Sequence, residues 1–148
     1  MHTALHISCI YGATNSFKVL FQNFYLKDEN RSSINQIDAD GNTALALAIK
    51  NHSKTINISN RDIKINNLLI IKSLIDANAD TKTLNFESYS CVHLLCENEC
   101  HIEDRLRILK TLGTNLYQLT EIRNIYGKSA WDCWSGMKLV EEPEVFSI

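Results

Sequence analysis

The chain has 148 residues, 45% of them hydrophobic, which suits one domain with a continuous core and excludes a disordered chain. Its formal net charge is only −2 and both signs are mixed, so nucleic acid and anionic membrane surfaces are not expected as partners. No stretch approaches the roughly 18 apolar residues that span a bilayer, and the N-terminus lacks the basic and apolar regions of a signal peptide.

The five cysteines are an odd number, unevenly spaced, in a chain large enough to fold without disulfide bonds. Free thiols in a reducing compartment fit this pattern. We therefore expect an intracellular protein, either cytoplasmic or nuclear.

Four short segments along the chain align with one another, and each pairs a hydroxyl residue with an apolar residue two places on. They are Thr3-Ala4-Leu5-His6, Thr43-Ala44-Leu45-Ala46, Ser90-Cys91-Val92-His93 and Ser129-Ala130-Trp131-Asp132. A hydroxyl side chain at this place caps the free N–H groups of a helix, so each segment predicts a helix start.

A turn precedes each of the last three segments, at residues 38–42, 85–89 and 124–128. Gly41 and Gly127 occupy equivalent places in two of these turns, where a glycine suits a backbone with positive φ.

A second helix is predicted after each of the first three starts, from apolar residues at spacings of three and four. The three faces are Phe17, Leu20, Phe21 and Phe24, then Leu68, Ile71, Leu74 and Ile75, then Leu106, Ile108, Leu109 and Leu112. A single helix pair is too small to bury such a face, whereas stacked pairs cover one another.

This arrangement resembles the ankyrin repeat, whose pattern is Asp-x-x-Gly-x-Thr-Pro-Leu-His, a helix, a turn, a second helix and Gly-Ala-Asp. Residues 38–46 match the start of that pattern, and residues 74–80 match its end, with Asn78 where the family has glycine. The resemblance implies an all-α solenoid of helix-turn-helix modules joined by β-turn or hairpin loops. The single domain 1–148 would hold four modules, namely 1–37, 38–84, 85–123 and a truncated C-terminal cap at 124–148.

The chain departs from the family in its spacing and in its missing prolines. The aligned segments begin at residues 3, 43, 90 and 129, a spacing of 40, 47 and 39 residues against about 33 in the family. The largest insertion, around residues 52–66, is expected to form a long loop or a distorted helix extension, and others lie at 27–33 and 116–122. The family proline is replaced by Ala4, Ala44, Cys91 and Ala130.

A cluster of cysteine and histidine between residues 91 and 101 offers the thiolate and imidazole ligands that zinc prefers. Cys96, Cys100 and His101 are the candidate ligands. Against zinc, no C-x-x-C knuckle is present, and His93 falls where the family uses histidine to tie turn to helix. We expect small buried cysteines, with no metal and no cofactor.

Catalysis is not expected either. Cys91 and His93 are the one close thiol and imidazole pair, and residues two apart on a helix point about 200° away from each other. The five glycines are scattered singly, so a phosphate-binding loop is absent from the sequence. His2, His52 and His101 fall in predicted turns and are expected to face solvent.

The resemblance implies a non-catalytic module, a scaffold, adaptor or effector, that binds another protein through its turn tips or concave face. An effector would act inside a host cell. No nucleic acid, membrane or small-molecule substrate is expected as a partner. The candidate contact residues are Ile37, Asp38, Asp40, Asn42, Phe86, Glu87, Tyr89, Arg123, Tyr126 and Lys128.

Three other interpretations remain open from the sequence. The insertions, above all residues 52–66, are a second candidate binding surface. The chain can also be the regulatory ankyrin segment of a larger protein such as a transcription factor or an enzyme. The last alternative is a zinc-dependent or thiol-dependent site around Cys91 to His101.

Overall fold

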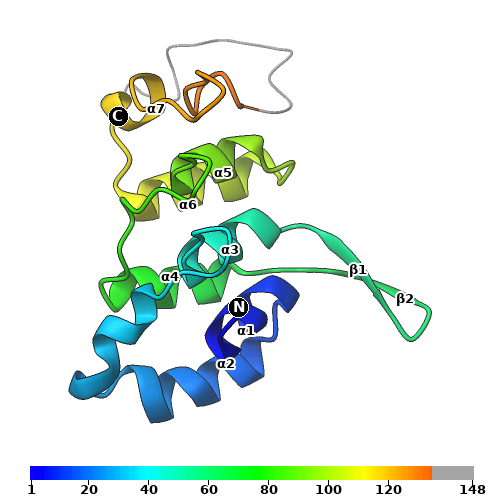
Figure 1. Ribbon diagram of the computed structural model, residues 1–148. Helices are drawn as coiled ribbons and strands as arrows, with labels where there is room; N and C mark the ends of the chain where they lie inside the picture. The colour runs from blue at the N-terminus through cyan, green and yellow to red at the C-terminus, as the bar shows by residue number, and fades with distance from the viewer. Residues whose placement is uncertain (135–148) are drawn as a thin grey trace.

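Three helix pairs stack in chain order in the computed structural model, which describes residues 1–134 (Figure 1). The α-helices are α1 (Ala4–Tyr11), α2 (Thr14–Leu20), α3 (Ala44–Asn51), α4 (Leu68–Asp76), α5 (Cys91–Glu97), α6 (Ile102–Leu112) and α7 (Leu116–Thr120). Helices α1, α3 and α5 form one row and α2, α4 and α6 the other, with each helix packed on its partner and on the next helix of its row. No described helix is long and apolar enough to cross a membrane.

The first helix of each pair begins at the expected hydroxyl residue. The Thr3, Thr43 and Ser90 side chains each accept a hydrogen bond from the backbone N–H three residues on. The predicted second helices are present as α2, α4 and α6. Asn78, which follows α4, has a φ of +62°, the left-handed conformation that the helix exit requires.

One continuous core runs between the two rows of helices. Its largest fully buried side chains include Phe17, Leu45, Ile70, Leu95 and Ile108, which come from all three pairs. Because each pair contributes one apolar layer, burial of the core depends on stacking.

The insertion at residues 52–66 is an antiparallel β-hairpin, so the expected loop or helix extension is wrong. Strand β1 (Thr55–Ile58) pairs with β2 (Arg61–Lys64), with Ile56 opposite Ile63. Ser59 and Asn60 both have positive φ, as in the type I′ turn that suits a two-residue hairpin loop. The isoleucines at 56, 58, 63 and 65 follow the two-residue period of a strand.

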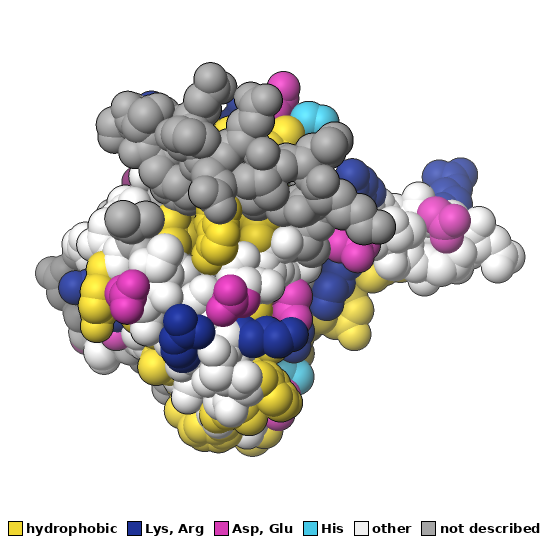
Figure 2. Space-filling model, turned by 90° about the horizontal axis from the view of Figure 1, so that it is seen from above, with side chains coloured by type: hydrophobic (Ala, Val, Ile, Leu, Met, Phe, Trp, Pro, Cys, Tyr) yellow, Lys and Arg dark blue, Asp and Glu magenta, His cyan; other side chains and the backbone are white. Residues whose placement is uncertain are grey.

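The expectation of an all-α solenoid is therefore wrong, and the described chain is a small mixed α/β structure. The hairpin leaves the stack at the C-terminal end of α3 and projects from the body of the molecule (Figures 1 and 2).

The smaller insertions and the last module also take specific forms. Helix α2 continues into a π-helical turn (Phe21–Tyr25) and then a 3₁₀ segment (Asp28–Asn35), while residues 116–122 contain α7. The fourth start, at Ser129, gives a turn rather than a helix over residues 130–133. Residues 135–148 of the fourth module lie outside the described residues.

A buried asparagine joins the first two modules at the base of the hairpin. The Asn67 side-chain amide donates to the Cys9 carbonyl at 2.8 Å and to the Ala48 carbonyl at 2.9 Å. Its backbone N–H donates to His52 Nδ1 at 3.0 Å, and His52 Nε2 contacts the Asp104 carboxylate at 2.9 Å. His52 is only 2% exposed, so the expectation that it faces solvent is wrong.

Replacing this asparagine tests how strongly the modules depend on it. Asn67→Ala should lower the free energy of unfolding by about 2–4 kcal/mol, because it removes two buried hydrogen bonds, one of them to the Cys9 carbonyl near the C-terminal end of α1. The exposed neighbour Asn66 provides the control, since Asn66→Ala should cost about 1 kcal/mol or less. Urea unfolding followed by circular dichroism measures both, and equal losses would contradict a joining role for Asn67.

Candidate functional site

The three turns that precede α3, α5 and Ser129 share one hydrogen-bond geometry. In each, the first residue is Asp or Asn, and its side-chain oxygen accepts from the backbone N–H groups two and four residues on. These residues are Asp38, Asn85 and Asn124, with N···O distances of 2.9 to 3.0 Å. The fourth residue has positive φ in every case, +81° at Gly41, +61° at Ser88 and +74° at Gly127. The turns are therefore internally rigid.

Backbone hydrogen bonds also join each turn to the next. The Phe86 N–H donates to the Asp40 carbonyl at 3.0 Å, and the Ile125 N–H donates to the Glu87 carbonyl at 3.1 Å. In both bonds the donor is the second residue of its turn and the acceptor is the third residue of the preceding turn. The same hydrogen bond therefore repeats between successive turns. We call residues 38–42, 85–89 and 124–128 the turn ladder.

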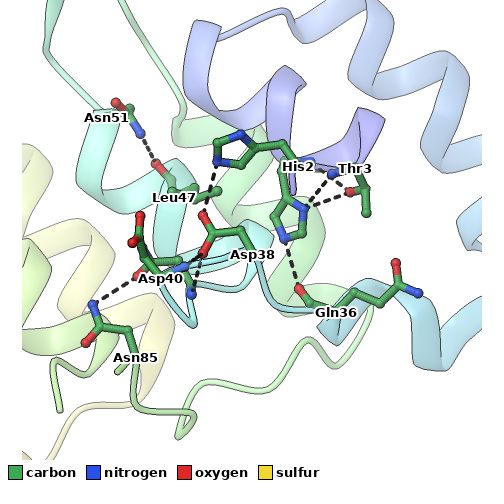
Figure 3. Close-up of polar contacts among 10 residues, drawn as sticks. His2, Thr3, Gln36, Asp38, Asp40, Leu47, Asn51 and Asn85 are labelled. Atoms are coloured by element: carbon green, nitrogen blue, oxygen red, sulfur yellow. Dashed lines mark hydrogen bonds and ion pairs between the residues drawn. The ribbon is translucent and has the colours of Figure 1, made fainter. Parts of the chain in front are cut away.

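Side chains reinforce the same two joints. The Asn85 side-chain amide donates to the Asn42 side-chain oxygen at 3.1 Å, as Figure 3 shows beside Asp38 and Asp40. The Tyr126 hydroxyl donates to the Glu87 carboxylate at 2.8 Å. The neighbouring turns are thus fixed relative to each other by side chains and by backbone.

Two buried histidines each join the start of their own helix to a main-chain carbonyl in or near the following turn. His6 Nδ1 accepts from the Thr3 N–H at 2.9 Å, and His6 Nε2 donates to the Gln36 carbonyl at 2.9 Å (Figure 3). His93 repeats this arrangement with the Ser90 N–H at 3.2 Å and the Lys128 carbonyl at 3.1 Å. These contacts require a neutral imidazole with its proton on Nε2. Burial lowers the pKa of both histidines from the ordinary value of 6.5, which favours the neutral form.

The turn ladder divides the ten candidate contact residues into two groups. Asp38 and Asn42 are buried and bonded within the turns, while Tyr89 is partly buried and packs against the His93 ring. The other seven are exposed, namely Ile37, Asp40, Phe86, Glu87, Arg123, Tyr126 and Lys128. Phe86 and Tyr126 are 66% and 62% exposed, and Ile125 beside them is 58% exposed. A row of large apolar side chains therefore stands on the ladder.

The turn-closing roles of Asn85 and Asn124 had a signal in the sequence. Asp or Asn recurs five residues before each hydroxyl residue of the last three segments, at positions 38, 85 and 124. Such a side chain commonly accepts from backbone N–H groups two residues on, so the recurrence predicts the shared turn.

The cysteine and histidine cluster does not converge on a metal. Within residues 1–134, no three side chains of His, Cys, Asp or Glu come together in a way that holds an ion. Cys96 and Cys100 are buried, while exposed His101 caps α6 through Nδ1. Burial raises the pKa of the Cys91 and Cys96 thiols to about 12, which disfavours the thiolate that metal binding and nucleophilic attack both need.

Comparison of the chain with protein-family models gave no match, and comparison with curated proteins gave none either.

Because the first two turns lie close together, stability should be sensitive to any side chain added at Gly41. A Cβ at Gly41 would come within 2.8 Å of the Phe86 backbone nitrogen, whereas a Cβ at Gly127 meets no described atom within 4 Å. Both positions have positive φ, so Gly127→Ala should cost about 1 kcal/mol from backbone strain alone. Gly41→Ala should cost about 1–3 kcal/mol more because the ladder must shift. Thermal unfolding compares the two, and equal losses would argue against the joint.

The neutral histidines predict a defined pH dependence. Because their folded pKa values lie below 6.5, the unfolded chain binds more protons in acid, and stability should fall as the pH drops below about 6.5. His93→Ala should lower stability at pH 7.5 and make the further loss between pH 7.5 and 5.5 smaller than in the wild type. Thr43→Ala removes the cap of the module that has Ala46 instead of histidine, and it should keep the full loss. Denaturation at both pH values measures this, and an unchanged loss in His93→Ala would refute the assignment.

Proposed function

We propose that the chain is a non-catalytic protein-binding module that uses the turn ladder as its contact surface. We further propose that it is a divergent relative of ankyrin-repeat proteins with a β-hairpin inserted in its second module. The observation that carries the function is the row of exposed Phe86, Ile125 and Tyr126 on turns joined by backbone hydrogen bonds.

The rigidity of the ladder favours binding. A surface that is already ordered loses little conformational entropy when a partner docks. Aromatic side chains ringed by polar groups contribute a large share of binding energy at protein interfaces. Phe86 and Tyr126 are such anchors, with Asp40, Glu87 and Lys128 exposed around them.

The state of the reactive side chains supports a binding role over catalysis. The His6 and His93 nitrogens are bonded to main-chain groups, and the Cys91 and Cys96 thiols are buried with raised pKa values. All five cysteines are free, which supports a reducing, intracellular compartment.

Variants of the ladder test the proposed contact surface. Phe86→Ala/Tyr126→Ala should reduce capture of the partner from cell lysate by about tenfold or more, because two aromatic anchors that the partner covers are worth over about 1.4 kcal/mol of binding energy together. Quantitative mass spectrometry of the captured proteins measures the change. Circular dichroism should show that the variant stays folded, since both side chains are mostly exposed.

The matched control removes equally exposed side chains elsewhere. Val19 on α2 and Tyr117 on α7 are 62% and 65% exposed and lie outside the ladder. Val19→Ala/Tyr117→Ala should retain the partner. A partner that is captured equally by wild type and both variants would refute the ladder as the contact surface.

A further inference from the structure

The hairpin exposes an isoleucine face that the turn ladder does not use. Ile56 and Ile63 stand opposite each other, and Ile58 lies two residues from Ile56, so all three point to one side of the sheet. Ile58 and Ile63 are 51% and 44% exposed. Arg61 pairs with Ile58 and ends the same face at the tip.

Helix α1 exposes a second apolar face. In α3 and α5 the residues at the place of Ile7 are Leu47 and Leu94, which are only 5% and 6% exposed because each helix rests on the preceding pair. Ile7 is 47% exposed and Tyr11, one turn on, is 57% exposed. Thus α1 presents the apolar face that the later modules bury.

The two apolar faces meet at the end of α1. Gly12 caps α1 next to Tyr11, and a Cβ there would come 2.8 Å from Ile65 Cγ2. Ile65 lies two residues after Ile63, on the same side of the hairpin. We call Ile7, Tyr11, Ile56, Ile58 and Ile63 the hairpin–α1 surface.

The base of the hairpin is fixed to the stack. Ser53 N–H donates to the Ile65 carbonyl and Ile65 N–H donates to the Lys54 carbonyl, both at 2.8 Å. Below them Asn67 bonds to both α1 and α3. The two parts of the hairpin–α1 surface are therefore held relative to each other.

The charge of the hairpin differs in sign from that of most of the chain. Residues 1–27 contain two lysines and no Asp or Glu, and residues 52–66 contain three Lys or Arg and one Asp. The remaining residues hold ten Lys or Arg and sixteen Asp or Glu. The hairpin part of the surface is thus basic, with Arg61 on its isoleucine face, while α1 itself carries no Asp, Glu, Lys or Arg.

We propose that the hairpin–α1 surface binds an extended acidic segment of a partner protein, with alternate apolar side chains against the isoleucines. The net positive charge of residues 52–66, with Arg61 on the isoleucine face, favours acidic groups on the partner. The sheet in the described chain has only two strands, so each has an unpaired edge, where an added strand gains backbone hydrogen bonds. The inference rests on the proposed function only in that the chain binds proteins, since it uses a different surface.

Residue-resolved NMR of the full chain with a defined probe tests this site. The probe is a short synthetic peptide that alternates valine with glutamate, and its counterpart carries lysine in place of every glutamate. The acidic peptide should shift the amide signals of residues 55–64 together with those of Ile7 and Tyr11. The lysine peptide should bind at least about tenfold more weakly, because each like charge opposes the basic surface.

Two variants and a control sharpen the result. Ile58→Thr/Ile63→Thr keeps strand-forming residues and should abolish the shifts, and Arg61→Glu should weaken binding by about tenfold. Leu84→Thr changes a residue that is 43% exposed outside this surface and should bind like the wild type.

Four results would overturn the proposal. Equal binding of the lysine peptide would remove the charge argument, and the absence of shifts with either peptide would remove the site. Signals of the same residues that respond instead to phosphatidylserine vesicles, or to protein concentration alone, would assign the surface to a membrane or to a second copy. Shifts confined to residues 38–42, 85–89 and 124–128 would reject the hairpin–α1 surface and leave the turn ladder as the contact surface. Loss of the ladder result alone would leave the hairpin result intact.

Discussion

Main-chain carbonyls near the ends of short helices need donors, and this need shapes the whole stack. The last turn of any helix leaves carbonyl oxygens without partners inside the helix. Here side chains of later residues supply donors: Asn67 donates to Cys9 of the preceding module and to Ala48 of its own, and Asn98 donates to Ile49 of the preceding module at 2.9 Å. His6 and His93 do the same for carbonyls next to or within the turns. Helices of seven to eleven residues in α2 to α6 have little stability alone, so these bonds and the shared core act together.

The helices were predicted well from sequence, because capping residues and apolar faces are patterns of residues that lie close together in the chain. The hydroxyl caps at 3, 43 and 90, the second helices and the left-handed Asn78 are all confirmed. The hairpin was missed although isoleucine alternates through it, because the surrounding polar and Asn-rich sequence is also typical of loops. The burial of His52 depends on Asn67 and Asp104, which lie 15 and 52 residues away. Such contacts have no local pattern in the sequence.

The turn positions were predictable from sequence, whereas the role of each side chain within a turn was not. Asp38 and Asn42 are polar and lie in a turn, features they share with exposed Asp40. Only the fold distinguishes them, since Asp38 closes its own turn and Asn42 accepts from Asn85 of the next turn. Fewer residues are therefore available to a partner than the turn contains.

The turn ladder also makes the distance between successive modules independent of the number of residues in each module. Successive segments are 40, 47 and 39 residues apart, yet the joints between turns have N···O distances of 3.0 and 3.1 Å. The extra residues lie at the far end of α3, after α2 and after α6, and none interrupts the ladder. A change in the number of residues at those places would therefore leave the spacing of Phe86, Ile125 and Tyr126 unchanged. The hydrogen bonds between the turns, and not the number of residues in each module, thus set the distance between the exposed side chains of the contact surface.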